Sequence, residues 1–118
     1  MSLHARLGVA VILVAVVGAL LALLARARPS YIPTVRVFVR LCAAAAAVEA
    51  LIGLVMLIGG QRPAEAIHFF YGAATVISIP AAELLARRVR PESEMMYLLA
   101  GVAATALFGL RAVTTGNM

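Results

Sequence analysis

Four long apolar segments dominate this chain, separated by short stretches that carry Arg, Pro and Gly. They cover residues 7–25, 35–58, 64–86 and 95–113. The hydrocarbon core of a bilayer is about 30 Å thick and an α-helix rises about 1.5 Å per residue, so roughly 20 apolar residues can cross it. Each segment has about this length. The sequence therefore predicts an all-α membrane protein with four transmembrane helices.

The composition also favours lipid as the surrounding solvent. Hydrophobic residues make up 64% of the 118 residues, and the mean hydropathy is +1.06. Soluble domains contain roughly 45–50% apolar residues, so this chain has too little polar surface for a water-soluble fold. We therefore treat residues 1–118 as a single integral membrane domain. Its net charge of +5 comes from arginines at the segment ends, without interleaved aromatic residues, so we expect no nucleic-acid partner.

The arginines are divided unevenly between the two ends that four spans would have. Seven lie in or next to the connections at 26–36 and 87–94, and three lie at the other end. The positive-inside rule places the Arg-rich end in the cytoplasm. We therefore expect a multi-pass protein of a cytoplasmic (inner) membrane, with both termini outside the cytoplasm.

Short connections between the spans predict the topology. Helices joined by only a few residues must run in opposite directions, which favours an up-down antiparallel bundle. Thr34 is placed to cap the second helix, Gly59 and Gly60 to end it, and Pro63 to lie in the first turn of the third.

The two halves of the chain also resemble each other. Residues 23–29 resemble 84–91, and residues 50–54 resemble 106–110. Such matches arise easily in a chain rich in Ala and Leu, so two duplicated helical hairpins stay a hypothesis.

Glu49 is the most informative polar residue, because it falls near the middle of the second span. An acidic residue at the centre of a membrane helix costs about 2.5–3.5 kcal/mol, so it should face the interior, find a partner or stay protonated. Gly53 lies one turn later on the same helix face and leaves room for a close neighbour. We consider two roles for Glu49: a proton-titrating transport site, or an interior residue that fixes the helix register.

A narrow polar stripe follows the third span, where His68, Tyr71, Thr75 and Ser78 recur at steps of three and four. Thr75 is expected at about the depth of Glu49, so Tyr71, Thr75 and Ser78 are candidates for lining a transport path with it. Pro80 follows and predicts a kink, because it lacks the N–H of a helix interior. In the alternative interpretation the hydroxyl groups bond back to their own helix and the kink is structural.

His68 raises the hypothesis of a haem or metal ligand, since membrane bundles can hold b-type haem between facing histidines. His4 is the second imidazole of the chain and precedes the first span on the same side. The sequence lacks an HxxxH motif, a Cys pair and a carboxylate–His cluster. We therefore expect no cofactor, and keep haem b as an alternative.

The remaining charged residues in or near the third and fourth spans suggest two further contacts. Glu65, His68 and Arg111 should form a polar cluster at the outer side, with Arg111 either snorkelling to the surface or turning inward. Glu83 and Arg87, four residues apart, have the spacing of a structural ion pair on a helix surface.

The absence of catalytic motifs limits the functional classes. The sequence contains no phosphate-binding loop, no H-E-x-x-H and no C-x-x-C, and its connections leave no room for a soluble catalytic domain, so we do not expect an enzyme. The first hypothesis is a subunit or accessory protein of a larger membrane complex, with the lipid bilayer and other membrane subunits or further copies as partners. The alternatives are a small oligomeric proton-coupled transporter or channel using Glu49, and an electron-transfer protein holding haem b through His68.

Overall fold

Four long helices make up nearly all of the structure, a computed structural model that describes residues 3–116. They are α1 (Leu3–Ala27), α2 (Ile32–Ile58), α3 (His68–Ala86) and α4 (Glu94–Gly116), with short 3₁₀ turns at Pro29–Tyr31 and Pro91–Ser93. All four are long and apolar enough to cross a membrane. The structure thus confirms an all-helical chain with four helices of transmembrane length.

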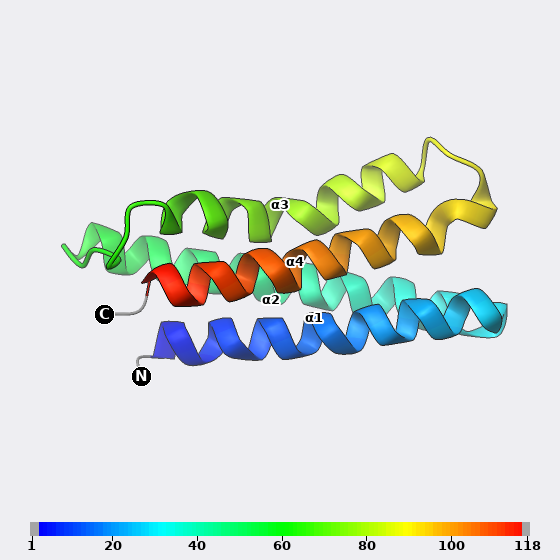
Figure 1. Cartoon of the computed structure of the whole chain (residues 1–118), viewed down its shortest axis with the longest axis horizontal. Helices are drawn as coiled ribbons and strands as arrows, with labels where there is room; N and C mark the ends of the chain where they lie inside the picture. Colours follow the sequence, from blue (N-terminus) through cyan, green and yellow to red (C-terminus); the bar gives the residue numbers. More distant parts are fainter. Residues whose placement is uncertain (1–2, 117–118) are drawn as a thin grey trace.

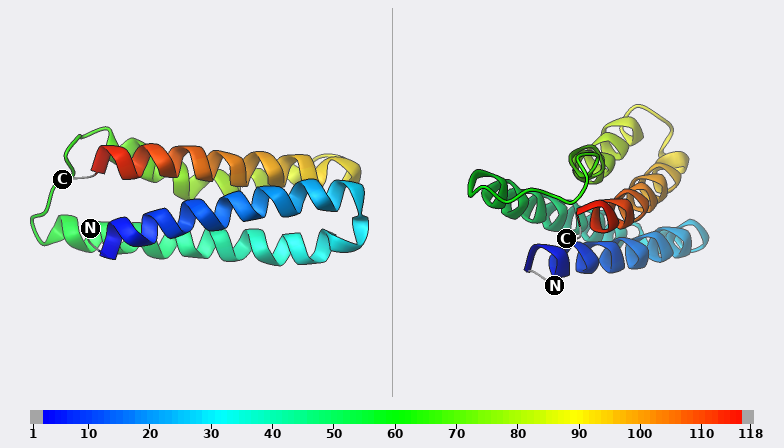
Figure 2. Two further views of the ribbon diagram at one scale, coloured as in Figure 1. Left: turned by 60° about the horizontal axis from the view of Figure 1, so that its bottom comes forward. Right: turned by 60° about the vertical axis from the view of Figure 1, so that its left-hand side comes forward.

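The helices lie side by side along the longest axis of a molecule that measures 46 × 25 × 18 Å, with both termini at the same end (Figure 1, Figure 2). Helix α4 packs against both α1 and α3, whereas α2 packs mainly against α1. In the apolar windows of the helices, 33% of the α4 residues are buried but only 11% of those in α2 and in α3. Helix α4 is therefore the central element, and α2 and α3 are peripheral.

Only one end of α2 is formed by the residues that were predicted to cap or end it. Helix α2 begins at Ile32, and its first turn contains Pro33. Its N-cap residue is Tyr31, which makes no side-chain cap hydrogen bond, so the cap expected from Thr34 is not formed. A proline in the first turn loses no helical hydrogen bond, which lets the helix begin before Thr34. The other end is as predicted: Gly60 has φ +94°, and the N–H groups of Gly60 and Gln61 donate to the carbonyls of Leu57 and Met56.

Helix α3 begins at His68, four residues later than the expected start at 64. Pro63 therefore lies outside the helix, which corrects its predicted place in the first turn. The physical reason is a tertiary hydrogen bond: the backbone N–H of Glu65 donates to the carbonyl of Thr115 on α4, at 3.0 Å. This bond holds residues 64–67 against the end of α4 and satisfies a backbone group without a further helical turn.

Small residues fill the interior, and large apolar residues cover the outside. The buried positions include Ala15, Ala22, Ala25, Cys42, Ala46, Gly101 and Gly109. Leu13, Leu20, Val37, Leu51 and Leu107, in contrast, are each 61% to 67% exposed. Lipid tails are as apolar as leucine, so membrane helices associate by close packing of small residues. This distribution is the one expected of helices surrounded by lipid.

The larger buried side chains gather toward the end that carries the connections at 28–31 and 87–93. A continuous cluster joins Val35 and Val39 of α2, Ile79 of α3, and Leu98 and Val102 of α4. These contacts hold α2, α3 and α4 together at this end of the molecule. The opposite end is held by polar contacts, which form the candidate site.

Candidate functional site

Glu49 and His4 form a pair in the interior between α2 and α1. Glu49 Oε1 contacts His4 Nδ1, and the side chains are only 14% and 22% exposed. Both atoms are buried, and within residues 3–116 their contact is an ion-pair contact without hydrogen-bond geometry. The structure places Glu49 in the interior beside His4, a residue expected before the first span.

Two glycines make room for this pair. A Cβ atom at position 53 would lie 2.8 Å from His4 Cε1, so the imidazole ring packs directly over the backbone of Gly53. On α1, a Cβ atom at position 8 would lie 3.8 Å from Glu49 Oε2 and 3.1 Å from the side chain of Val113. Glu49 Oε2 is buried there and has no hydrogen-bond partner within residues 3–116. Gly53 therefore leaves the space that the His4 ring occupies.

His68 completes this polar group from α3. Its Nδ1 atom lies 2.6 Å from the carbonyl oxygen of Ala112 and 3.5 Å from Thr115 Oγ1. Because a carbonyl oxygen only accepts, Nδ1 carries the hydrogen and donates it. The His68 ring lies edge to face with the His4 ring, with 6.1 Å between the ring centroids. We call His4, Glu49 and His68 the histidine–glutamate cluster.

The histidine–glutamate cluster joins three titratable side chains that come from three helices. In both histidines the Nδ1 atom faces an oxygen atom, which leaves Nε2 as the position for a further partner. The haem hypothesis concerns His4 and His68, the two imidazoles of the chain, and the structure places their rings next to each other. Within residues 3–116 no group of three or more His, Cys, Asp or Glu side chains could hold a metal ion. The chemistry available to the cluster itself is proton exchange between carboxylate and imidazole.

The polar stripe of α3 does not join this cluster. Thr75 Oγ1 donates to the carbonyl of Tyr71 at 2.7 Å, and Ser78 Oγ to that of Ala74 at 2.6 Å, as the structural interpretation expected. Thr75 lies beside Gly109, whereas Glu49 lies beside Gly8 and Val113, about one helical turn nearer the chain termini. The two side chains therefore contact different levels of α4, and Thr75 does not reach the Glu49 carboxylate.

Pro80 lies inside α3, and the helix axis bends along its length (Figure 1). Near the bend, α4 comes very close: a Cβ atom at position 101 would lie 2.6 Å from Ala82 Cβ and 3.4 Å from the carbonyl of Ser78. Thr105 Oγ1 also donates to the carbonyl of Thr75, at 3.4 Å. Sequence reasoning missed Thr105; its signal was a lone hydroxyl in the middle of the fourth apolar segment.

The expected outer cluster of Glu65, His68 and Arg111 is replaced by other contacts. The Arg111 side chain is exposed, and its guanidinium lies over the ring of Tyr71, 5.5 Å from the ring centroid. Glu65 is exposed and contacts α4 through its backbone N–H. His68 instead turns to Ala112 and Thr115, because their oxygen atoms are the nearer acceptors in the interior.

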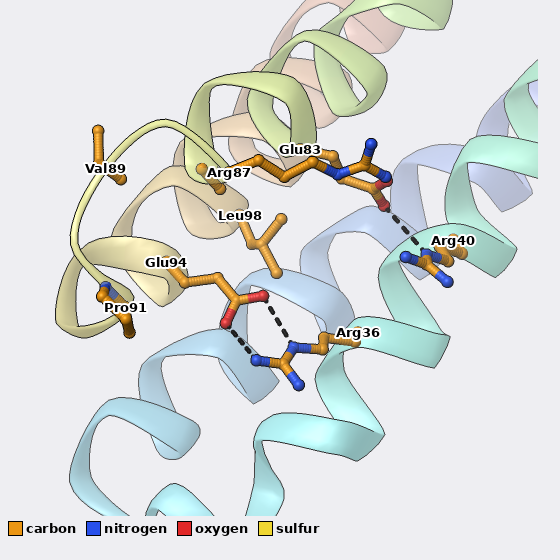
Figure 3. Close-up of a pocket in the computed structure, with 9 residues that line it drawn as sticks. Arg36, Arg40, Glu83, Arg87, Val89, Pro91, Glu94 and Leu98 are labelled. Carbon is orange, nitrogen blue, oxygen red and sulfur yellow. Dashed lines mark hydrogen bonds and ion pairs between the residues drawn. The ribbon is translucent and has the colours of Figure 1, made fainter.

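At the other end of the molecule, two ion pairs tie α2 to α3 and α4 (Figure 3). Arg36 Nε and Nη2 donate to the two carboxylate oxygens of Glu94, at 2.8 and 2.6 Å. Glu83 lies 3.7 Å from Arg40 of α2, so its ion-pair partner is not Arg87, the partner that the four-residue spacing suggested. Sequence reasoning missed the pair of Arg36 and Glu94; its only signal was opposite charge at the same end of the second and fourth spans.

The structure thus contains two polar regions at opposite ends, the histidine–glutamate cluster near the termini and the arginine–glutamate pairs near the two short 3₁₀ turns. Between them the interior is mostly apolar, with Thr75 and Thr105 as its buried hydroxyl groups among the described residues. No family model matches the chain, and neither a curated protein nor a solved structure matches it.

Proposed function

We propose that this protein is an accessory subunit of a larger membrane complex, and that the outer face of α2 packs against a transmembrane helix of a partner subunit. The observation that carries the proposal is a continuous exposed apolar row on α2. Its members recur at alternating steps of four and three residues: Val37, Leu41, Ala44, Val48, Leu51, Val55 and Ile58.

The spacing of this row supports a helix as the partner. Alternating steps of three and four residues give a seam with a mean period of 3.5 residues, which matches helices that cross at about +20°. Val37, Leu51 and Val55 are 61% to 68% exposed, so the other three helices leave the seam uncovered. The seam carries no polar side chain, and Ala44 near its centre allows a partner helix to approach closely.

The proposed position in the membrane follows from the arginines. In an up-down antiparallel bundle, Arg26, Arg28, Arg36 and Arg40 share one end with Arg87, and the positive-inside rule assigns that end to the cytoplasm. The protein would then lie in a cytoplasmic membrane with both termini outside the cytoplasm. The hairpins α1–α2 and α3–α4 would be the two copies if the internal resemblance reflects duplication.

Site-directed crosslinking in native membranes tests the α2 contact. In a Cys42→Ala background, Val48→Cys would carry a photo-crosslinker, and Leu13→Cys on α1, of similar exposure, is the matched control. We expect Val48→Cys to yield one defined protein adduct and Leu13→Cys to yield none. Native mass in mild detergent should exceed that of one chain. A single-chain mass together with equal labelling at both positions would contradict the proposal.

A second candidate function, proton-coupled transport, is favoured by one specific observation. Glu49 and His4 are titratable groups in contact inside a membrane-length bundle, a place where ionisable residues usually serve proton or ion movement. In vesicles loaded with a pH-sensitive dye, the wild-type protein should then carry a proton flux that Glu49→Gln abolishes. Glu83→Gln at the opposite end is the control. Equal flux through wild type, Glu49→Gln and empty vesicles would remove this candidate.

A further inference from the structure

An open cleft lies at the Arg-rich end of the molecule, between α2 and the residues that join α3 to α4 (Figure 3). Its volume is about 420 Å³, and its charged lining consists of Arg36, Arg40, Glu83, Arg87 and Glu94. We call this the arginine cleft. Its place at the ends of three membrane-length helices puts it at the level where lipid headgroups meet the hydrocarbon core.

The arginine cleft adjoins a second open pocket along the groove between α2 and α3. This cavity has a volume of about 320 Å³ and shares Arg40, Glu83 and Arg87 with the first. Its remaining lining is Ala43, Ile79 and Pro80, which lie deeper in the membrane-length part of the two helices. A charged mouth with Ala43, Ile79 and Pro80 at its deeper end has the form of a site for an amphiphile.

The charges at the mouth favour an anion. Arg36 is held by both oxygens of Glu94, so this pair is internally neutralised. Arg40 and Glu83 are 3.7 Å apart, and the Arg40 side chain is 67% exposed, so it keeps most of its donors free. Arg87 takes part in none of the ion pairs found among residues 3–116. Three arginines therefore face two glutamates, and the excess positive charge lies on Arg40 and Arg87.

We propose that the arginine cleft binds one anionic phospholipid, whose phosphate lies on Arg40 and Arg87 and whose acyl chain follows Ala43, Ile79 and Pro80. This inference rests on the proposed position of the Arg-rich end in the cytoplasmic leaflet. Guanidinium groups bind phosphate oxygens in a bidentate manner, and basic pockets between membrane helices select anionic headgroups. The apolar groove distinguishes a lipid from free phosphate, which has nothing to place there.

Native mass spectrometry of the full chain in mild detergent tests this site, with phosphatidylglycerol as the probe and phosphatidylcholine as its zwitterionic control. We expect one phosphatidylglycerol per chain to be retained, and the Arg40→Gln/Arg87→Gln variant to lose about tenfold in retention. Arg62→Gln, which changes an arginine at the opposite end, should retain lipid like wild type. Equal retention of the two lipids, or no loss in the double variant, would overturn the proposal.

A second variant separates lipid from free phosphate and controls for folding. Ala43→Trp fills the groove and leaves both arginines in the chain, so it should reduce phosphatidylglycerol retention while helical circular dichroism stays unchanged. Inorganic phosphate at equal concentration should compete only weakly. If phosphate displaces the lipid fully and Ala43→Trp has no effect, the ligand is free phosphate and the lipid assignment is wrong. These readouts use the isolated chain, so they do not depend on whether a partner subunit binds α2.

Discussion

The contact between Glu49 and His4 shows how a single carboxylate shapes its surroundings in a membrane protein. A bare carboxylate in hydrocarbon is unfavourable, and here the imidazole of His4 lies in contact with it. Gly8 and Gly53 keep the space that the two side chains occupy. Each member of the pair therefore stabilises the burial of the other. Removing one member should lower the free energy of unfolding more than removing both.

A double-mutant cycle on this pair checks that reasoning. His4→Leu leaves Glu49 buried without its partner, so we expect it to lower the free energy of unfolding by about 1–3 kcal/mol, the usual penalty for an unsatisfied buried polar group. In His4→Leu/Glu49→Leu both polar groups are gone, and much of the loss should be recovered. The measurement is thermal unfolding in detergent, followed by circular dichroism. Strictly additive effects of the two substitutions would show that the contact contributes nothing.

At the scale of the helices, close packing between α3 and α4 depends on the absence of a side chain at position 101. The space there is already taken by Ala82 and by the backbone of Ser78 and Ile79, and none of these is the flexible end of a long side chain. Gly72, one helix away, has open space where its Cβ atom would be. Gly101 thus allows α3 and α4 to pack closely. Gly72 makes no such contact and only lowers the stability of its own helix.

Alanine at these two positions should therefore act in opposite directions. Gly101→Ala must push α4 away from α3, and we expect a loss of about 1–3 kcal/mol, as for other overpacked interiors. Gly72→Ala adds a good helix former without a clash and should be neutral or stabilising by up to about 1 kcal/mol. Thermal unfolding of the two variants under identical detergent conditions measures the difference. Equal melting temperatures would show that α3 and α4 do not depend on this close approach.

At the scale of the whole molecule, hydropathy was sufficient to predict the four spans, because each helix needs only its length and its apolar residues to be recognised. The interior place of Glu49 was also predictable, because hydrocarbon excludes a bare carboxylate. Its partner was not, because His4 reaches it only if α1 starts at Leu3. In the same way, the start of α3 and the partner of Glu83 depend on contacts with α4 and α2, which no local pattern contains.

The orientation of the whole molecule in the membrane can be established directly by experiment. In the Cys42→Ala background, Ser30→Cys and Gln61→Cys place exposed thiols in the connections at opposite ends. Because the positive-inside rule puts the arginine-rich connections in the cytoplasm, a membrane-impermeant maleimide should label Gln61→Cys in cells with an intact inner membrane. Ser30→Cys should become labelled only after the membrane is permeabilised. The reverse pattern would invert the topology and place the arginine cleft in the outer leaflet.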